Sequence, residues 1–381
     1  GCEVSVQNYI SSIISETGYN PTLVPLDEDI SSDPDYTHVP GHKGYGGRDN
    51  IIVDIAGAGG GRSAIINTHS DVVVGPDELF NPRVEDGVVY GRGACDAKGQ
   101  VVTALVVLKA LKSLGIELCG DLQIQLVIEE ETGGNGSLSL IRQGHRADAA
   151  VVLEPTSLGL KPANRGAVWY RLEMTGKSVH MGKYWEGVNA VAETMNLMGV
   201  LKEYEEYLRK QSKGNPLFLD SPSPIVVNIG TIQGGDWPAT LAGKCVVEGG
   251  IAFLPNRRIA EIYDEIMGWI DKHASEWAKG HYKLEFPRLH NEAFETDIEH
   301  PSVKTFCQAA KTSLGFCEPC GWVASCDARL FYHRGKMPTV VFGPGDLEHA
   351  HSLQEQIRVD DILRAAEALV LFIIDWCGKS N

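Results

Sequence analysis

The sequence predicts an α/β fold with a mostly parallel sheet, into which a smaller α+β unit is inserted. Short apolar runs alternate with helical patterns in the first and last parts of the chain, which is typical of a layered α/β domain. The middle part follows the order strand-helix-strand-strand-helix-strand, which is the ferredoxin-like order. A chain of 381 residues is also too long to fold around one compact hydrophobic core. We therefore expect segments at 1–165 and 293–381 to form one domain, and 166–292 to form the inserted one.

In the α/β segments, helical spacing of apolar residues predicts a first helix over 4–17, which ends near Gly18. Residues 28–50 are polar and rich in Gly, Pro and Asp, so they are predicted to be a loop. The remaining predicted elements are strands at 51–55, 64–67, 122–128, 149–153 and 339–342, and helices at 100–114, 301–314 and from about 360.

In the inserted segment, residues 168–175 alternate between apolar and polar side chains, which predicts a half-exposed strand. The other predicted elements here are helices at 187–208 and 259–277 and strands at 225–231, 244–253 and 282–289.

Charge and composition exclude several classes of partner. The 34 basic and 50 acidic residues give a net charge of −16, which argues against nucleic acid or an anionic membrane as the main partner. No apolar run approaches the roughly 20 residues of a membrane span, and no signal-peptide pattern is visible, so we expect a cytoplasmic protein. The nine cysteines are scattered, and Cys317 and Cys320 have no second pair of similar spacing, so we expect reduced thiols.

Residues able to bind a metal follow the predicted strands. His69 follows an apolar strand, and Asp71 points the same way in an extended chain, so its carboxylate could orient the imidazole. An unrelated turn aspartate is the alternative. Asp96 lies in a glycine-rich bend before a helix, where an ordinary N-cap is the alternative interpretation.

Three consecutive carboxylates, Glu129 to Glu131, come directly after another apolar strand. Like charges and burial raise carboxylate pKa values, and a divalent metal would offset this while leaving a neighbouring glutamate as general base. A solvated acidic turn is the alternative. Glu154 also ends a strand, and His349 and His351 follow the last strand. Such ligands can converge at one edge of an α/β sheet, where together they would suit a dinuclear zinc site.

These motifs together resemble the M20 metallopeptidase family, the group of acetylornithine deacetylase, succinyl-diaminopimelate desuccinylase, aminoacylase and glutamate carboxypeptidase. The resemblance runs from about residue 1 to residue 375. The motifs that carry it are His69-Ser-Asp71, Gly91-Arg-Gly-Ala-Cys-Asp96-Ala-Lys-Gly99, Glu129-Glu-Glu131, Glu154-Pro-Thr and Gly343-Pro-Gly followed by Ala350-His351.

The resemblance implies a zinc-peptidase-like catalytic domain that holds two Zn²⁺ per subunit, although Co²⁺ or Mn²⁺ suits the same donors. The implied metal ligands are His69, Asp96, Glu131, Glu154 and His351. Asp96 would bridge the two metals, Asp71 would orient His69, and Glu130 would be the general base for a metal-bridging water. Glutamate at position 154 resembles the deacylase and carboxypeptidase branches.

The inserted segment resembles the lid and dimerisation domain of this family, which implies a homodimer. The stretch Gly176-Lys-Ser-Val-His180, followed by Glu186-Gly-Val-Asn-Ala190, matches the segment whose histidine reaches into the partner's active site. His180 would then stabilise the oxyanion. Without the resemblance, His180 reads as a surface histidine at a strand end.

The chain departs from the family at two substrate-binding positions. Many deacylases of the family hold the substrate carboxylate with an Asn in the lid loop and an Arg in the following strand; both are missing, and Ala252 lies near the Arg position. Arg165, Lys244 and Arg329 are candidate substitutes, and Trp237 is a candidate apolar wall. The departure is compatible with a substrate that has no free carboxylate.

We therefore expect a dinuclear-metal amidohydrolase, similar to acetylornithine deacetylase, that cleaves a linear amide of a small N-acyl compound. The alternative activities are those of a dipeptidase or carboxypeptidase, or of a deformylase acting on an N-formyl amine that lacks a carboxylate. A catalytically silent binding protein is disfavoured because every expected catalytic and metal position is filled.

Overall fold

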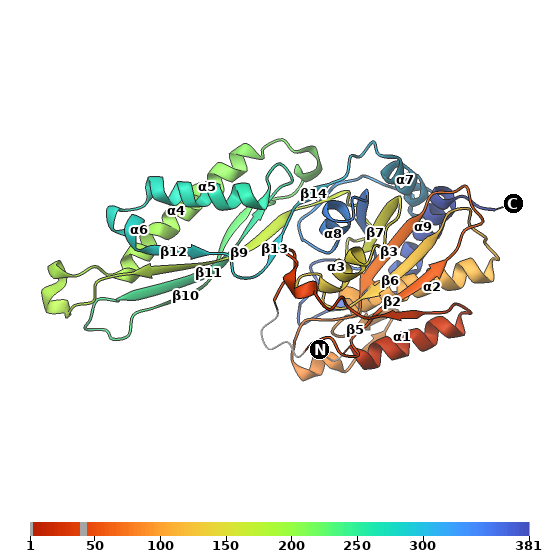
Figure 1. Ribbon diagram of the computed structural model, residues 1–381, viewed down its shortest axis with the longest axis horizontal. Coiled ribbons are helices and arrows are strands. Elements are labelled where there is room, and N and C mark those ends of the chain that lie inside the picture. The colour runs from red at the N-terminus through yellow and green to blue at the C-terminus, as the bar shows by residue number, and fades with distance from the viewer. Residues whose placement is uncertain (1–2, 39–43, 381) are drawn as a thin grey trace. The chain divides into compact units, whose positions relative to one another are not determined.

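The chain forms two compact units in a computed structural model that describes residues 3–38 and 44–380 (Figure 1). The first unit comprises Gly1–Ala163, Phe294–Trp322 and Cys326–Asn381, and the second comprises Asn164–Ala293 and Val323–Ser325. The short piece 323–325 differs from the predicted division, which places it in the α/β domain. A three-residue segment is too short to show a hydrophobic pattern that would reveal the unit with which it packs.

A six-stranded sheet forms the centre of the first unit, in the order β1-β2-β6-β3-β7-β16. The pairs β6–β3, β3–β7 and β7–β16 are parallel, whereas β2 is antiparallel to both of its neighbours. The sheet is therefore mostly parallel, as predicted. Its strands are β1 (Thr22–Val24), β2 (Asn50–Ile55), β3 (Ala64–His69), β6 (Leu122–Val127), β7 (Ala149–Leu153) and β16 (Thr339–Phe342).

Helices bury the apolar side chains of this sheet. Residues of α1, α2, α7 and α9 form one large core with strand residues such as Ile66, Ile124 and Val151. Leu140 of α3 packs with Val24, Ile52 and Val127 in a separate small cluster. The helices are α1 (Val4–Glu16), α2 (Gly99–Ser113), α3 (Asn135–Arg142), α7 (Pro301–Leu314), α8 (Ala328–His333) and α9 (Val359–Cys377).

Smaller elements complete the first unit. Strands β4 (Arg83–Glu85), β5 (Val88–Tyr90) and β17 (Gln356–Arg358) form an antiparallel sheet. Two-residue strands β8 (Ala163–Asn164), β14 (Phe294–Glu295) and β15 (Gly321–Trp322) lie where the chain changes unit. Short helical turns are η1 (Ile30–Ser32), η2 (Asp77–Phe80) and η3 (Ala94–Lys98).

The second unit has an antiparallel sheet in the order β10-β11-β9-β12. Numbered along this unit, the strands lie in the order 2-3-1-4, which together with the two intervening helices is the ferredoxin-like arrangement. The elements are β9 (Gly166–Thr175), η4 (Met181–Glu186), α4 (Ala190–Gln211), η5 (Pro216–Phe218), β10 (Val226–Gly234), β11 (Lys244–Phe253), α5 (Ile259–His273), α6 (Glu276–His281), β12 (Tyr282–Glu285) and β13 (His290–Asn291).

Two predicted elements of this unit are interrupted in the structure. The helix predicted over 259–277 breaks at Ala274, whose backbone is extended, and Ser275 caps the new helix α6 by accepting the N–H of Ala278. The strand predicted over 282–289 ends at Glu285, shortly before Pro287, which has no N–H to donate to a neighbouring strand.

Elements too short for a clear periodic pattern were not predicted. They include β1, α3 and α8, of three, eight and six residues. Within the described ranges, no helix combines the length and the apolar character needed to cross a membrane. The eight described cysteines are free thiols, and Cys2 lies outside the described residues.

Candidate metal centre and active site

The sheet of the first unit brings the candidate ligands to one edge. Strands β6, β3 and β7 are parallel neighbours, so their carboxyl ends lie at the same edge of the sheet. His69 ends β3, the three consecutive glutamates follow β6, and Glu154 follows β7. Strand β16, parallel to β7, leads into the segment that carries His351.

Two groups of possible metal ligands share Asp96. His69, Asp96 and Glu154 form one group, and Asp96, Glu131 and His351 form the other, with the ligand atoms of each group within 4.8 Å of one another. The two oxygens of Asp96 face different imidazoles: Oδ1 lies 3.1 Å from Nε2 of His69, and Oδ2 lies 3.2 Å from Nε2 of His351. Asp96 therefore has the arrangement that a bridging carboxylate needs.

The electrostatics of this cluster suit two divalent cations. Burial, reinforced by nearby carboxylates, raises the pKa values of Glu131 and Glu154. The buried Oε1 atom of Glu131 has no hydrogen-bond partner among the described residues. Imidazole nitrogens and carboxylate oxygens are zinc donors, and cations there would compensate the crowded negative charge.

Asp71 binds the backbone of the glutamates as well as contacting His69. Its Oδ1 and Oδ2 atoms accept hydrogen bonds from the backbone N–H groups of Glu130 (3.2 Å) and Glu131 (3.1 Å). Its Oδ1 also lies 3.4 Å from Nδ1 of His69, whose nearer partner is the backbone carbonyl of Asp71 at 3.1 Å. Asp71 is therefore placed to position both an imidazole and the loop that carries the glutamates.

Glu130 lies beside these groups without belonging to either set of ligands. Burial raises the pKa of its carboxyl well above the usual value, and the negative charges of Glu154 and Asp327 add to this. A carboxylate with a raised pKa binds a proton more readily, which is a property of a general base.

Glu129 has a different environment, so the three consecutive glutamates do not act as one group. It is 4% exposed, its Oε1 lies 2.7 Å from Arg48, and its Oε2 accepts hydrogen bonds from Tyr45 (2.8 Å) and Asn135 (3.0 Å). These partners compensate the buried charge. The alternative of a solvated acidic turn is therefore wrong for this segment.

The candidate residues for substrate binding differ in burial and in their partners. Arg329, in the first unit, is 3% exposed and donates from Nη2 to the carbonyl of Gly133 at 2.9 Å, so it supports the loop after the glutamates. In the second unit, Lys244 pairs with Glu173 at 2.7 Å, Arg165 is half-buried and Trp237 is 70% exposed.

His180, also in the second unit, is exposed and precedes η4. Its Nδ1 accepts a hydrogen bond from the N–H of Gly182 at 3.1 Å. In a neutral ring this leaves the proton on Nε2, which is then available as a donor.

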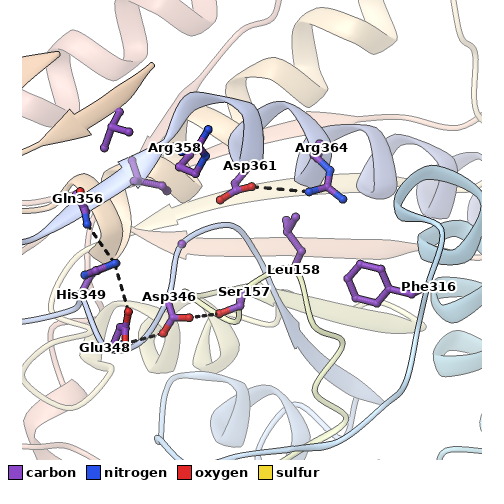
Figure 2. Close-up of a pocket in the computed structure, with 13 residues that line it drawn as sticks. Ser157, Leu158, Phe316, Asp346, Glu348, His349, Gln356, Arg358, Asp361 and Arg364 are labelled. Carbon is purple, nitrogen blue, oxygen red and sulfur yellow. Dashed lines mark hydrogen bonds and ion pairs between the residues drawn. The ribbon is translucent and has the colours of Figure 1, made fainter. Parts of the chain in front are cut away.

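His349, the first of the two histidines after β16, belongs to a neighbouring pocket. His349 lines a cavity of about 380 Å³ in the first unit, where its Nε2 lies 3.2 Å from the amide nitrogen of Gln356 and 3.6 Å from Glu348 (Figure 2). The structure thus places His351, and not His349, among the possible metal ligands.

Two buried acids near the site were not predicted. Glu355 binds the bend before Asp96 through several backbone N–H groups. Asp327 is 1% exposed, and burial raises its pKa to about 6. Both are isolated acids in their segments, so spacing gave no signal for them.

Curated proteins of known activity are similar to nearly the whole chain. An N-formyl-4-amino-5-aminomethyl-2-methylpyrimidine deformylase of Bacillus subtilis (strain 168) is 28% identical over 377 residues, covering 88% of this chain and 85% of the relative. An acetylornithine deacetylase of Pasteurella multocida (strain Pm70) is 26% identical, covering 97% and 90%.

Comparison with solved structures supports the fold. The aminopeptidase PepT from Bacillus cereus ATCC 10987 superposes with a TM-score of 0.73 at 19% identity, covering 97% of this chain and 92% of that one. The sequence profile of peptidase family M20/M25/M40 matches residues 65–375. The chain therefore belongs to peptidase family M20/M25/M40 and is a hydrolase of amide bonds.

Proposed function

We propose that this enzyme removes a small acyl group from an amine, with two divalent cations bound by the two groups that share Asp96. The observation that carries the proposal is the position of Asp96, whose two carboxylate oxygens face the imidazoles of His69 and His351. His69, Asp96 and Glu154 would hold one cation, and Asp96, Glu131 and His351 the other. When bound, the cations supply Lewis acidity that lowers the pKa of water and polarises the scissile carbonyl.

Glu130 is the proposed general base. Its carboxylate accepts a proton from the water molecule whose oxygen adds to the acyl carbon. The same proton then passes to the nitrogen of the leaving amine as the C–N bond breaks, so the products are a carboxylic acid and an amine. Burial and neighbouring charges, which raise the pKa of Glu130, favour this uptake of a proton. Asp71 accepts a hydrogen bond from the backbone N–H of Glu130 and so fixes the backbone from which this side chain extends.

His180 is the proposed donor to the oxygen that gains negative charge during addition of water. The hydrogen bond from Gly182 to Nδ1 supports this role, because it leaves Nε2 as the protonated nitrogen. We further propose that His180 acts in the active site of a second subunit, in a cytoplasmic homodimer formed through the second unit. Light scattering that finds only monomers at assay concentration would contradict this part.

The proposed substrate is an N-formyl or N-acetyl amine without a free carboxylate. The absence of the family's Asn and Arg from the lid segment supports this, since Ala252 offers no charge to a carboxylate. The relatives named above include a deformylase and a deacetylase. A substrate whose amine carries an aromatic ring could pack against Trp237, which is exposed.

A paired substrate screen tests the proposal. The zinc-loaded protein is given N-formyl, N-acetyl and N-succinyl derivatives of one aromatic amine, each with a matched compound bearing a carboxylate beside the amide, together with dipeptides. We expect release of the amine from the formyl or acetyl compound, with kcat/KM at least about tenfold above that of its carboxylate partner, since the site lacks the pairing that a carboxylate requires. Turnover of dipeptides alone would identify a peptidase instead, and no turnover with zinc, cobalt or manganese would contradict the proposal.

A further inference from the structure

The carboxylate of Glu355 accepts hydrogen bonds from several backbone N–H groups of the bend that leads into Asp96. Its Oε1 atom accepts hydrogen bonds from the backbone N–H groups of Gly93 (2.9 Å), Cys95 (3.0 Å) and Asp96 (3.0 Å). Its Oε2 atom accepts a hydrogen bond from the guanidinium of Arg92. The side chain of Glu355 is fully buried, and that of Arg92 is 3% exposed. One carboxylate therefore satisfies three backbone donors of an irregular segment and one buried cation.

This arrangement is costly to disturb. Backbone N–H groups buried without a partner each destabilise a structure by about 1–3 kcal/mol, and a buried charge that loses its partner costs more. Gly93 adopts φ of +85°, and a Cβ atom there would lie 2.8 Å from Val72. The bend thus depends on a glycine conformation and on an acceptor that reaches it from elsewhere in the chain.

Glu355 also lies on the same short segment as His351. The N–H of Gly91 donates to the carbonyl of Glu355 at 3.0 Å, and the next residue, Gln356, pairs with Tyr90 in the β17–β5 ladder. Four residues earlier, Nε2 of His351 lies 3.2 Å from Asp96 and 2.9 Å from Glu131. The anchoring of this segment at Glu355 therefore affects two of the three members of the group formed by Asp96, Glu131 and His351.

The two groups of ligands are supported unequally. His69 and Glu154 are 1% and 3% exposed and directly follow or end buried strands. The side chain of His351 is 52% exposed and lies in an irregular segment with φ of +58°. Support from Glu355 is thus more important for the group that contains His351.

We propose that Glu355 is a positioning residue for Asp96 and His351. In particular, it maintains the cation site formed by Asp96, Glu131 and His351. The inference rests on the proposed two-cation function, which it deepens. Residues that support metal ligands through hydrogen bonds typically contribute a factor of about 10–100 to metal affinity or activity. Loss of the Glu355 carboxylate should therefore convert a protein that binds two cations into one that binds a single cation tightly.

Three variants test this. Glu355→Gln keeps the size of the side chain but removes the charge and places an NH₂ group among N–H donors. Glu355→Asp keeps the charge but shortens the reach. Glu348→Gln is the matched control, because Glu348 lies in the same segment with 74% of its side chain exposed. Each purified protein is dialysed against zinc with graded chelator, and zinc per chain is measured by elemental analysis, together with kcat and KM.

We expect two zinc ions per chain for the wild type and Glu348→Gln, and loss of one zinc from Glu355→Gln at a chelator concentration at least about tenfold lower. Glu355→Asp should lose one zinc at a chelator concentration between those for the wild type and Glu355→Gln. If Glu355→Gln does not fold, Glu355→Asp provides the test. A purely structural role would lower the melting temperature without changing the zinc content of the folded protein. Wild-type zinc content in the folded Glu355 variants would overturn the inference while leaving the proposed function intact. A wild type that holds two zinc ions but hydrolyses no amide would contradict the function alone.

Discussion

The carboxylate of Asp71 accepts a hydrogen bond from the backbone N–H of Glu130 at a distance of 3.2 Å. Because the other oxygen of Asp71 accepts the N–H of Glu131, one side chain fixes the loop that carries the proposed general base and a proposed metal ligand. Asp71 therefore has a structural task beyond the orientation of His69.

Asp71→Asn should disturb this loop. The amide has only one oxygen, so its NH₂ group would face a backbone N–H that needs an acceptor. We expect kcat to fall by about 10–100-fold, with weaker binding of zinc, because loss of such supporting contacts has this effect in metal sites. Steady-state kinetics and zinc content check the prediction. Asp77→Asn, at an exposed aspartate, is the control, and a variant as active as that control would contradict the assigned role.

Glu130→Gln should separate catalysis from metal binding. Glu130 belongs to neither group of possible ligands, so the variant should keep both cations. It should lose hydrolysis by about 10²–10⁴-fold, because an amide cannot accept the proton from water. Zinc analysis and amine release measure the two properties on one sample. Glu85→Gln, at a surface ion pair, should behave like the wild type. Near-normal turnover by Glu130→Gln would show that another group is the base.

Zinc binding to the metal-free protein should release protons at neutral pH. Hydrogen bonds that the imidazole of His351 donates to the carboxylates of Asp96 and Glu131 raise its pKa to about 10. Burial lowers the pKa of His69, but the hydrogen bonds with Asp71 and Asp96 outweigh it, so that this pKa is also raised. Imidazoles with raised pKa values hold protons at about pH 7 and must lose them to bind zinc.

Calorimetric titrations with zinc in two buffers of different ionisation enthalpy measure this release. The heat of binding should depend on the buffer in the direction of proton release, and less so for His351→Ala. Equal heats in both buffers would contradict the protonation that the geometry implies.

Asp33→Asn should lower the stability of the first unit. It should also make this stability depend less on pH in the acidic range. Oδ2 of Asp33 accepts hydrogen bonds from Arg142 (2.8 Å) and Arg334 (2.7 Å), and its side chain is 2% exposed. Burial alone would raise its pKa, but the N–H of Asp35 and the two arginines hold the pKa below the usual 3.8. Asp33 therefore stabilises the fold above about pH 4, and this contribution disappears as the pH falls through the lower pKa of the folded state.

We expect Asp33→Asn to lower the free energy of unfolding by about 2 kcal/mol near pH 7, as for other hydrogen bonds to charged groups. The loss should be smaller near pH 3. Urea unfolding at both pH values measures the difference, with the exposed Asp29→Asn as control. An equal loss at both pH values would mean that packing, and not charge, is the cause.

The pattern of residues by itself determined most of the architecture. Helical periodicity identified the first helix and the helix over 301–314, and the βαββαβ order identified the ferredoxin-like unit, because a buried face imposes a repeat on the chain. Residues at strand ends supplied the candidate ligands, because parallel strands share one functional edge.

Tertiary structure decided which of these residues meet. The sequence alone offers three adjacent glutamates, but only the fold places Arg48 and Tyr45 beside Glu129 and brings His351 to 2.9 Å from Glu131. It likewise brings Glu355 to the bend before Asp96, across more than 250 residues of chain. Local spacing cannot encode such pairs, because each depends on where distant segments pack and on which buried charge must find a partner.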